Sequence, residues 1–250
     1  PIGGMGSALA CRGPSCWAFN LAVRLAGSTS EQVALIDLKP APSDLALLLD
    51  FEPKHTLDEV CRNWQRMDRR MLKTAMASHP SGLQVLAQAT YPEEGGVPQD
   101  TLSEEAVRQL LTLVRRSYAV SVVDLAHTLD ARQIEAMRLS SFVGLVVRPD
   151  VPGLRRARWA LDTAAQMGLP RNRFRLILSR CGGRGQIDVD QVEEILGIRV
   201  FHRIPEDHHA VNRAINRGVP LVELAKRSRI SRSFSSLARS VQTSVGEVTA

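Results

Sequence analysis

Short apolar segments rich in β-branched residues alternate with longer segments of helical periodicity along almost the whole chain. The strand-like segments are 33–36, 120–123, 142–147, 174–178 and 198–201. The helix-like segments are 103–117, 131–139, 153–167, 189–196 and 208–217. Strands that are apolar along their whole length and separated by helices are typical of a parallel sheet covered on both faces. The alternation therefore predicts an α/β fold with a single doubly wound, mainly parallel sheet.

Size and hydropathy favour one domain. With 250 residues, of which 44% are hydrophobic, the chain can bury a sizeable core. Its longest apolar runs, such as Phe142–Val147, have the length of a strand, whereas a bilayer-spanning helix needs about 20 apolar residues. No charged segment followed by an apolar one opens the chain as in a signal peptide. We expect a cytoplasmic protein with one domain over residues 1–250, in which 1–13 form an irregular or truncated start.

The spacing of the cysteines disfavours a zinc site or a disulfide, and the distribution of charge disfavours a specific nucleic-acid partner. The four cysteines, Cys11, Cys16, Cys61 and Cys181, form no CxxC pair and no zinc-like spacing with histidine, which favours reduced thiols. A net charge of +6 permits contact with nucleic acid or anionic lipid. The basic residues are spread along the chain, however, and neither a zinc finger nor an RNP-like aromatic motif is present. We expect no specific nucleic-acid partner.

Two aspartates follow strand-like segments directly. Asp37 comes after 33–36, and Asp124 comes after 120–123. Ligands of doubly wound sheets bind beyond the carboxyl ends of the strands, where a carboxylate can hold Mg²⁺ through water or orient an attacking water. The alternative is that either aspartate caps a helix or hydrogen-bonds a loop. Two such positions in one sheet favour a nucleotide site.

Glycines near the N-terminus resemble a degraded phosphate-binding loop. Gly3, Gly4 and Gly6 are followed by Gly13-Pro14-Ser15-Cys16 and then by an apolar helix-like segment. Backbone N–H groups around such glycines can face an anion at a helix N-terminus. The lysine of such loops is missing, since the first lysine of the chain is Lys39. On this segment alone, an irregular glycine-rich start is an equally good interpretation.

The C-terminal segment from Ser228 has one apolar stripe at helical spacing. The stripe consists of Ile230, Phe234, Leu237, Val241 and Val245, with Arg229, Arg232 and Arg239 around it. We expect a helix that packs against the sheet. The alternative is a basic helix lying on a membrane surface.

Several blocks of sequence resemble, in the same order, the TadZ/CpaE pilus-assembly branch of the ParA/MinD superfamily. Residues 33–38 followed by 44–57 resemble its stretch VLLVDLDL…GDVAL.LDLEPRHTL, and 78–86 resemble HPSGL.VL. Residues 118–125 resemble YDYVVVDL, and 204–207 with 214–221 resemble IP.D…A.N.GVPL. The elements His55-Thr56-Leu57 and Gly218-Val219-Pro220-Leu221 are specific to this branch.

The resemblance implies a Rossmann-like P-loop NTPase fold and a homodimer that sandwiches ATP and Mg²⁺. It also implies a role in localising and assembling the Tad/Flp pilus machinery, at the inner face of the membrane or the cell pole. The implied partners are pilus-assembly proteins. In this branch a receiver-like domain commonly precedes the ATPase-type domain.

The resemblance carries over individual site residues. Asp37 matches the catalytic aspartate near the hydrolytic water, and Asp124 matches the Walker B aspartate that supports Mg²⁺ through water. Gly13, Ser15 and Cys16 fall on the phosphate-loop pattern G-[KA]-S-T, which implies that they bind the nucleotide. Ser15 is also expected to be a ligand of Mg²⁺. Ser179-Arg180 lies where relatives often have Asn-Arg beside adenine, and Pro205-Glu206 flanks the base.

The phosphate loop departs most from the branch. Its lysine positions fall on Leu9 and Pro14, and we expect no strand before it. A missing lysine predicts weak ATP binding and slow or absent hydrolysis, because the contact to the β- and γ-phosphates is lost. The alternatives are a nucleotide-free pseudo-ATPase scaffold and a ParA-like partition protein that binds DNA non-specifically. A small-molecule enzyme on the same scaffold would need an intact lysine loop.

Overall fold

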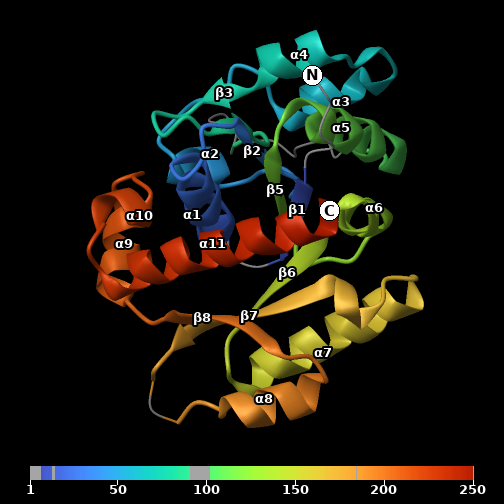
Figure 1. Cartoon of the computed structure of the whole chain (residues 1–250). Helices are drawn as coiled ribbons and strands as arrows, with labels where there is room; N and C mark the ends of the chain where they lie inside the picture. The colour runs from blue at the N-terminus through green and yellow to red at the C-terminus, as the bar shows by residue number, and fades with distance from the viewer. Residues whose placement is uncertain (1–6, 13–14, 91–101, 184, 250) are drawn as a thin grey trace.

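The computed structural model describes residues 7–12, 15–90, 102–183 and 185–249, which build one eight-stranded sheet (Figure 1). The strands lie in the order β3-β4-β2-β5-β1-β6-β7-β8. Their bounds are β1 Ser7–Arg12, β2 Val33–Asp37, β3 Ala77–Ser78, β4 Gln84–Leu86, β5 Val120–Leu125, β6 Phe142–Val147, β7 Phe174–Cys181 and β8 Val200–Pro205. Neighbouring strands are parallel except for the antiparallel pair β3 and β4. The predicted α/β fold with a mainly parallel sheet is confirmed.

Helices cover both faces of the sheet. Their bounds are α1 Ser15–Ala26, α2 Leu45–Leu48, α3 Leu57–Arg62, α4 Arg69–Ala75, α5 Glu104–Ser117, α6 Ala131–Leu139, α7 Val151–Gln166, α8 Val189–Leu196, α9 His208–Asn216, α10 Leu221–Leu224 and α11 Arg229–Thr249. Apolar side chains of α3 to α8 form the core on one face, and those of α1, α2 and α9 to α11 form the core on the other.

Strand β2 shows why its sequence is apolar without interruption. Ala34 and Ile36 belong to the first core, whereas Val33 and Leu35 belong to the second. Successive residues of a strand point to opposite faces. A strand covered on both faces therefore needs apolar residues at every position.

Aspartate and serine residues cap the N-termini of many of the helices. Side-chain oxygens of Ser103, Asp130, Asp150 and Asp207 accept a hydrogen bond from the backbone N–H three residues on, at the starts of α5, α6, α7 and α9. Such caps satisfy one of the free N–H groups of the first helical turn. The predicted segments 131–139, 142–147 and 189–196 coincide with α6, β6 and α8.

Strand β8 is shifted from its predicted position, 198–201. It covers Val200–Pro205 instead. Gly197 ends α8 in the left-handed conformation, with φ of 65°, so the next two residues form the connection to the sheet. The shift places Pro205 and Glu206 at the carboxyl end of β8.

Strand β1 corrects the expectation for the N-terminal segment. Residues 1–13 were expected to be irregular, with no strand before the phosphate loop, yet Ser7–Arg12 form β1 between β5 and β6. The segment Ser-Ala-Leu-Ala-Cys-Arg has few residues of high β propensity, so its place in the sheet comes from its neighbours on both sides. Only residues 13 and 14 separate β1 from α1.

The C-terminal helix α11 packs into the core, as its stripe predicts. Ile230, Phe234, Leu237 and Val241 are each at most 2% exposed, while the side chain of Val245 lies outside the described part. The Phe234 ring stacks on Trp17 of α1 at 5.0 Å between ring centroids, and Figure 1 shows α11 lying across α1. Within the described residues, no helix combines the length and apolarity that a bilayer crossing requires.

Candidate functional site

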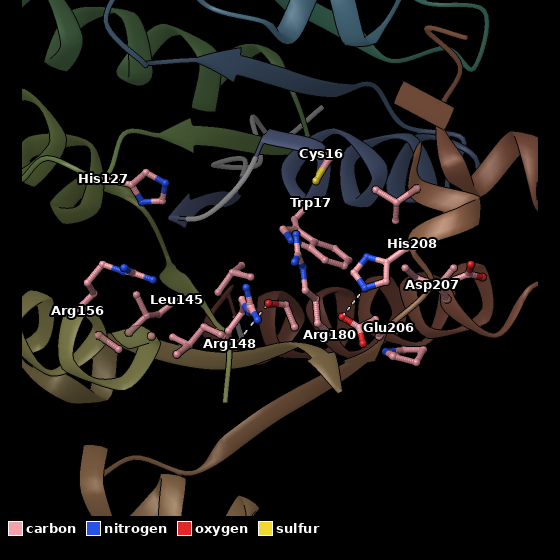
Figure 2. Close-up of a pocket in the computed structure, with 18 of the residues that line it drawn as sticks. Cys16, Trp17, His127, Leu145, Arg148, Arg156, Arg180, Glu206, Asp207 and His208 are labelled. Atoms are coloured by element: carbon pink, nitrogen blue, oxygen red, sulfur yellow. Dashed lines mark hydrogen bonds and ion pairs between the residues drawn. The ribbon is translucent and has the colours of Figure 1, made fainter. Parts of the chain in front are cut away.

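A pocket of about 750 Å³ opens at the carboxyl ends of β6, β7 and β8. Figure 2 shows Cys16 and Trp17 of α1 on one side, and Arg148, Arg180 and Glu206 on the other. Helix α7 contributes Arg156 and Trp159 to the lining, and α9 contributes residues from its first two turns. The pocket thus lies at the edge of the sheet where a doubly wound fold places its ligand.

Many of the predicted site residues meet in this pocket. Cys16, Ser179, Arg180, Pro205 and Glu206 all line it, although they come from three separate parts of the chain. Gly13 lies outside the described residues. The resemblance therefore selected residues that the fold brings to one cavity.

The lining of the pocket carries more positive than negative groups. Arg148, Arg156 and Arg180 contribute guanidinium groups, which suit carboxylate or phosphate ligands because of their planar array of donors. On the acidic side, Glu206 lies 2.9 Å from the His208 imidazole. An anionic ligand with an apolar part fits this combination of arginines and a tryptophan.

The main chain at Arg180 adopts an unusual conformation. Its φ is 57°, a left-handed value that non-glycine residues rarely take. The Gln186 side chain holds this turn, since its Nε2 donates to the Arg180 carbonyl and its Oε1 accepts from Gly182 N at 3.0 Å. Backbone conformations of this kind gather at functional sites.

Asp37 and Asp124 lie side by side at the neighbouring strands β2 and β5, outside the lining of the pocket. They are register partners, and both are fully buried. The Ser43 hydroxyl donates to Asp37 Oδ2 at 2.5 Å, and Lys39 N donates to Asp37 Oδ1 at 3.3 Å. The two carboxylates predicted from the strand ends therefore lie next to each other. Both oxygens of Asp37, however, already accept hydrogen bonds from the loop that follows β2.

Lys39 is the site residue that the sequence reasoning missed. Its Nζ lies 3.2 Å from Asp124 Oδ2 and donates a short hydrogen bond to Ser15 Oγ. The contact with Asp124 has the distance of an ion pair but not the alignment of a hydrogen bond. The available signal was that the first lysine of the chain stands two residues after Asp37.

Burial is the largest influence on the pKa values of Asp124, Asp37 and Cys16. It raises the pKa of Asp124 to about 7, with the Lys39 charge opposing and the Asp37 charge adding to the shift. Burial likewise raises the pKa of Asp37, against the Ser43 hydrogen bond and the Lys39 charge. Burial also raises the pKa of the Cys16 thiol to about 11, so this thiol is neutral at physiological pH.

A cation of the chain itself already engages Ser15 and Asp124, the two residues that the sequence assigned to Mg²⁺. The Lys39 ammonium already contacts both. A metal ion fits there only after the Lys39 side chain has moved away.

The fold is shared with ParA/MinD proteins. No family model matches the sequence, and no curated protein matches it. Among solved structures, a ParA family ATPase from Chlorobium tepidum TLS has 22% identity and a TM-score of 0.84, covering 93% of this chain and 98% of its own. A chain of the Aquifex aeolicus MinC:MinD cell division protein complex has 20% identity and a TM-score of 0.79, with 95% of this chain and 96% of that chain covered. Pyrococcus horikoshii OT3 MinD, complexed with Mg-ADP, has 20% identity and a TM-score of 0.77, with 98% and 99% covered.

Proposed function

We propose that this chain is a ParA/MinD-type nucleotide-binding protein that localises and helps assemble the Tad/Flp pilus machinery, with weak ATP binding and slow or absent hydrolysis. The observation that carries the nucleotide part is the gathering of the predicted base-side residues in one pocket. Solved structures of the same fold include one that holds Mg-ADP. The likeness supports an adenine nucleotide as the ligand class.

The chemistry of the pocket is consistent with this ligand. Its volume of about 750 Å³ lies within the range of small-molecule sites, roughly 300–1,000 Å³. A nucleotide needs an apolar surface for its base and cations for its phosphates. Apolar residues such as Trp17 and Trp159 supply the first, and Arg148, Arg156 and Arg180 supply the second.

The proposed pilus role rests on the resemblance of several segments to TadZ/CpaE, and some of these segments contact one another in the fold. A Cβ atom at Gly218 would lie 2.6 Å from the Cβ of Asp50, and both residues have positive φ. Burial lowers the pKa of His79, and the nearby Glu223 carboxylate opposes this shift. Segments 44–57 and 214–221 thus pack together at Asp50 and Gly218, and His79 of segment 78–86 lies near Glu223, two residues beyond 214–221.

Arg180→Ala is expected to weaken ATP binding. A hydrogen bond to a charged group contributes about 1.5–3 kcal/mol, and a loss of about 1.4 kcal/mol is tenfold in affinity. The dissociation constant for ATP, measured by calorimetry, should rise about tenfold or more. Arg199→Ala is the matched control. Arg199 is exposed and directly precedes β8, so it lies at the amino end of that strand, whereas the pocket lies at the carboxyl end. If the two variants bind ATP with equal affinity, the pocket is not the ATP-binding site.

We further infer that two copies associate through the face that bears the strand carboxyl ends. Val151, Trp159 and Ile215 are exposed, and the last two line the pocket. Sedimentation should detect a dimer at high concentration with ATP, and Trp159→Glu should shift it toward the monomer. Ile195→Glu is the control, since Ile195 is exposed near the C-terminal end of α8 and does not line the pocket. A strict monomer with and without nucleotide contradicts the inference.

Deleting the gene in its own organism tests the pilus role. Cells should lose assembled Tad/Flp pili, and a fluorescent fusion should concentrate at the membrane or the cell pole. Intact pili would contradict the proposal. Plasmid loss, together with DNA binding that weakens steeply with salt, would instead identify a partition protein.

A further inference from the structure

Lys39 is held in place by its backbone as well as by its side chain. Its N–H donates to Asp37 Oδ1 at 3.3 Å, and its carbonyl accepts from Gln88 Nε2 at 3.3 Å. Its side chain is only 21% exposed. The ammonium therefore reaches Ser15 and Asp124 from a fixed position beside the carboxyl end of β2.

The two buried carboxyl groups favour a cation at this point. Asp37 and Asp124 are both fully buried, and a buried carboxylate without a partner is costly. Among the described side chains, Lys39 is the one cation within ion-pair distance of either. Its ammonium is thus the internal counter-charge of the carboxylate pair.

The same ammonium lies close to the pocket. Cys16 lines the pocket and directly follows Ser15, whose hydroxyl accepts from Lys39. The Cys16 thiol lies within electrostatic reach of Lys39, Asp124 and Arg180 together. An ammonium has three donors, and its hydrogen bond to Ser15 engages one of them.

We propose that Lys39 supplies from within the chain the positive charge that a divalent cation would bring to Ser15 and Asp124, so that this site neither binds nor needs Mg²⁺. For the nucleotide, the proposal rests on the proposed function: the phosphates are bound by Lys39 and the pocket arginines without a metal ion. One ammonium carries half the charge of Mg²⁺, which agrees with slow or absent hydrolysis.

A thermal-unfolding experiment without nucleotide tests the metal part. Millimolar MgCl₂ should leave the melting temperature of the wild-type protein unchanged. Lys39→Met should melt lower, because it leaves Asp124 unpaired, and MgCl₂ should restore part of the loss by binding the vacated position. Lys39→Arg should behave as the wild type toward MgCl₂, and Lys54→Met, which removes an exposed lysine, should change neither property. Stabilisation of the wild type by MgCl₂ to the same extent as Lys39→Met would overturn the proposal.

Calorimetric titration of the wild type with ATP, in EDTA and in MgCl₂, tests the nucleotide part and does not depend on any variant folding. The two dissociation constants should agree within about twofold, a difference of less than 0.5 kcal/mol. Binding only in MgCl₂ would overturn the proposal and leave nucleotide binding intact. An absence of binding in both buffers would contradict the proposed function and the nucleotide part together, while the unfolding experiment would still decide the metal part.

Discussion

Phe234→Ala is expected to lower the free energy of unfolding by about 3–5 kcal/mol, the usual cost of removing a buried phenylalanine side chain. Phe234 is 1% exposed and stacks on Trp17, so the truncation opens a cavity between α11 and α1. Urea unfolding followed by fluorescence or circular dichroism measures the change.

Arg232→Ala is the control for this experiment, because Arg232 is exposed on the same helix. Its stability should stay within about 0.5 kcal/mol of the wild type. Unchanged stability of Phe234→Ala, with loss of binding to anionic liposomes, would instead favour the membrane-surface interpretation of α11.

Gly153→Ala is expected to destabilise the fold by about 1–3 kcal/mol or more and to reduce ATP affinity. A Cβ atom at this position would lie 2.4 Å from the Arg148 carbonyl oxygen and 2.8 Å from Asp150 Oδ1. The first turn of α7 would have to move away from the end of β6. Because Gly153 and Arg148 both line the pocket, the displacement would change the position of a guanidinium group as well.

Gly27→Ala is the matched control for this second substitution. A Cβ at Gly27 would lie 3.5 Å from the Val23 carbonyl oxygen, an ordinary contact, so little change is expected in urea unfolding or in ATP titration. Equal stabilities of the two alanine variants would show that α7 can shift at no cost.

The elements that could be predicted from the sequence are those whose patterns are long or sharply bounded. Helix α6 begins at the Asp130 cap, and β6 is an uninterrupted apolar run. By contrast, β1 and β4 were missed, because Ser-Ala-Leu-Ala-Cys-Arg and Gln-Val-Leu are short and weak in strand propensity. Their pairing partners decide their conformation, and β5 and β6, which flank β1, and β2, which pairs with β4, lie far away in the chain.

In the candidate site, too, some residues could be predicted from the sequence and others could not. Asp124 could be assigned because it directly follows a strand-like segment, whereas Arg180 was assigned through the resemblance to TadZ/CpaE. The role of Lys39 depends on where a long side chain reaches across from β2 to the start of α1. No spacing rule in the sequence connects Lys39 with Ser15, so only the folded chain could identify this contact.

The short link between β1 and α1 has an evolutionary consequence. Arg12 ends the strand and Ser15 begins the helix, whereas a phosphate loop of the G-x-x-x-x-G-K type needs a longer connection to wrap around an anion. Pro14→Lys alone would therefore not recreate such a loop, since inserted residues and the withdrawal of Lys39 would also be required. An efficient ATPase of that type would therefore take several simultaneous changes, which would keep the metal-independent phosphate binding proposed above in place.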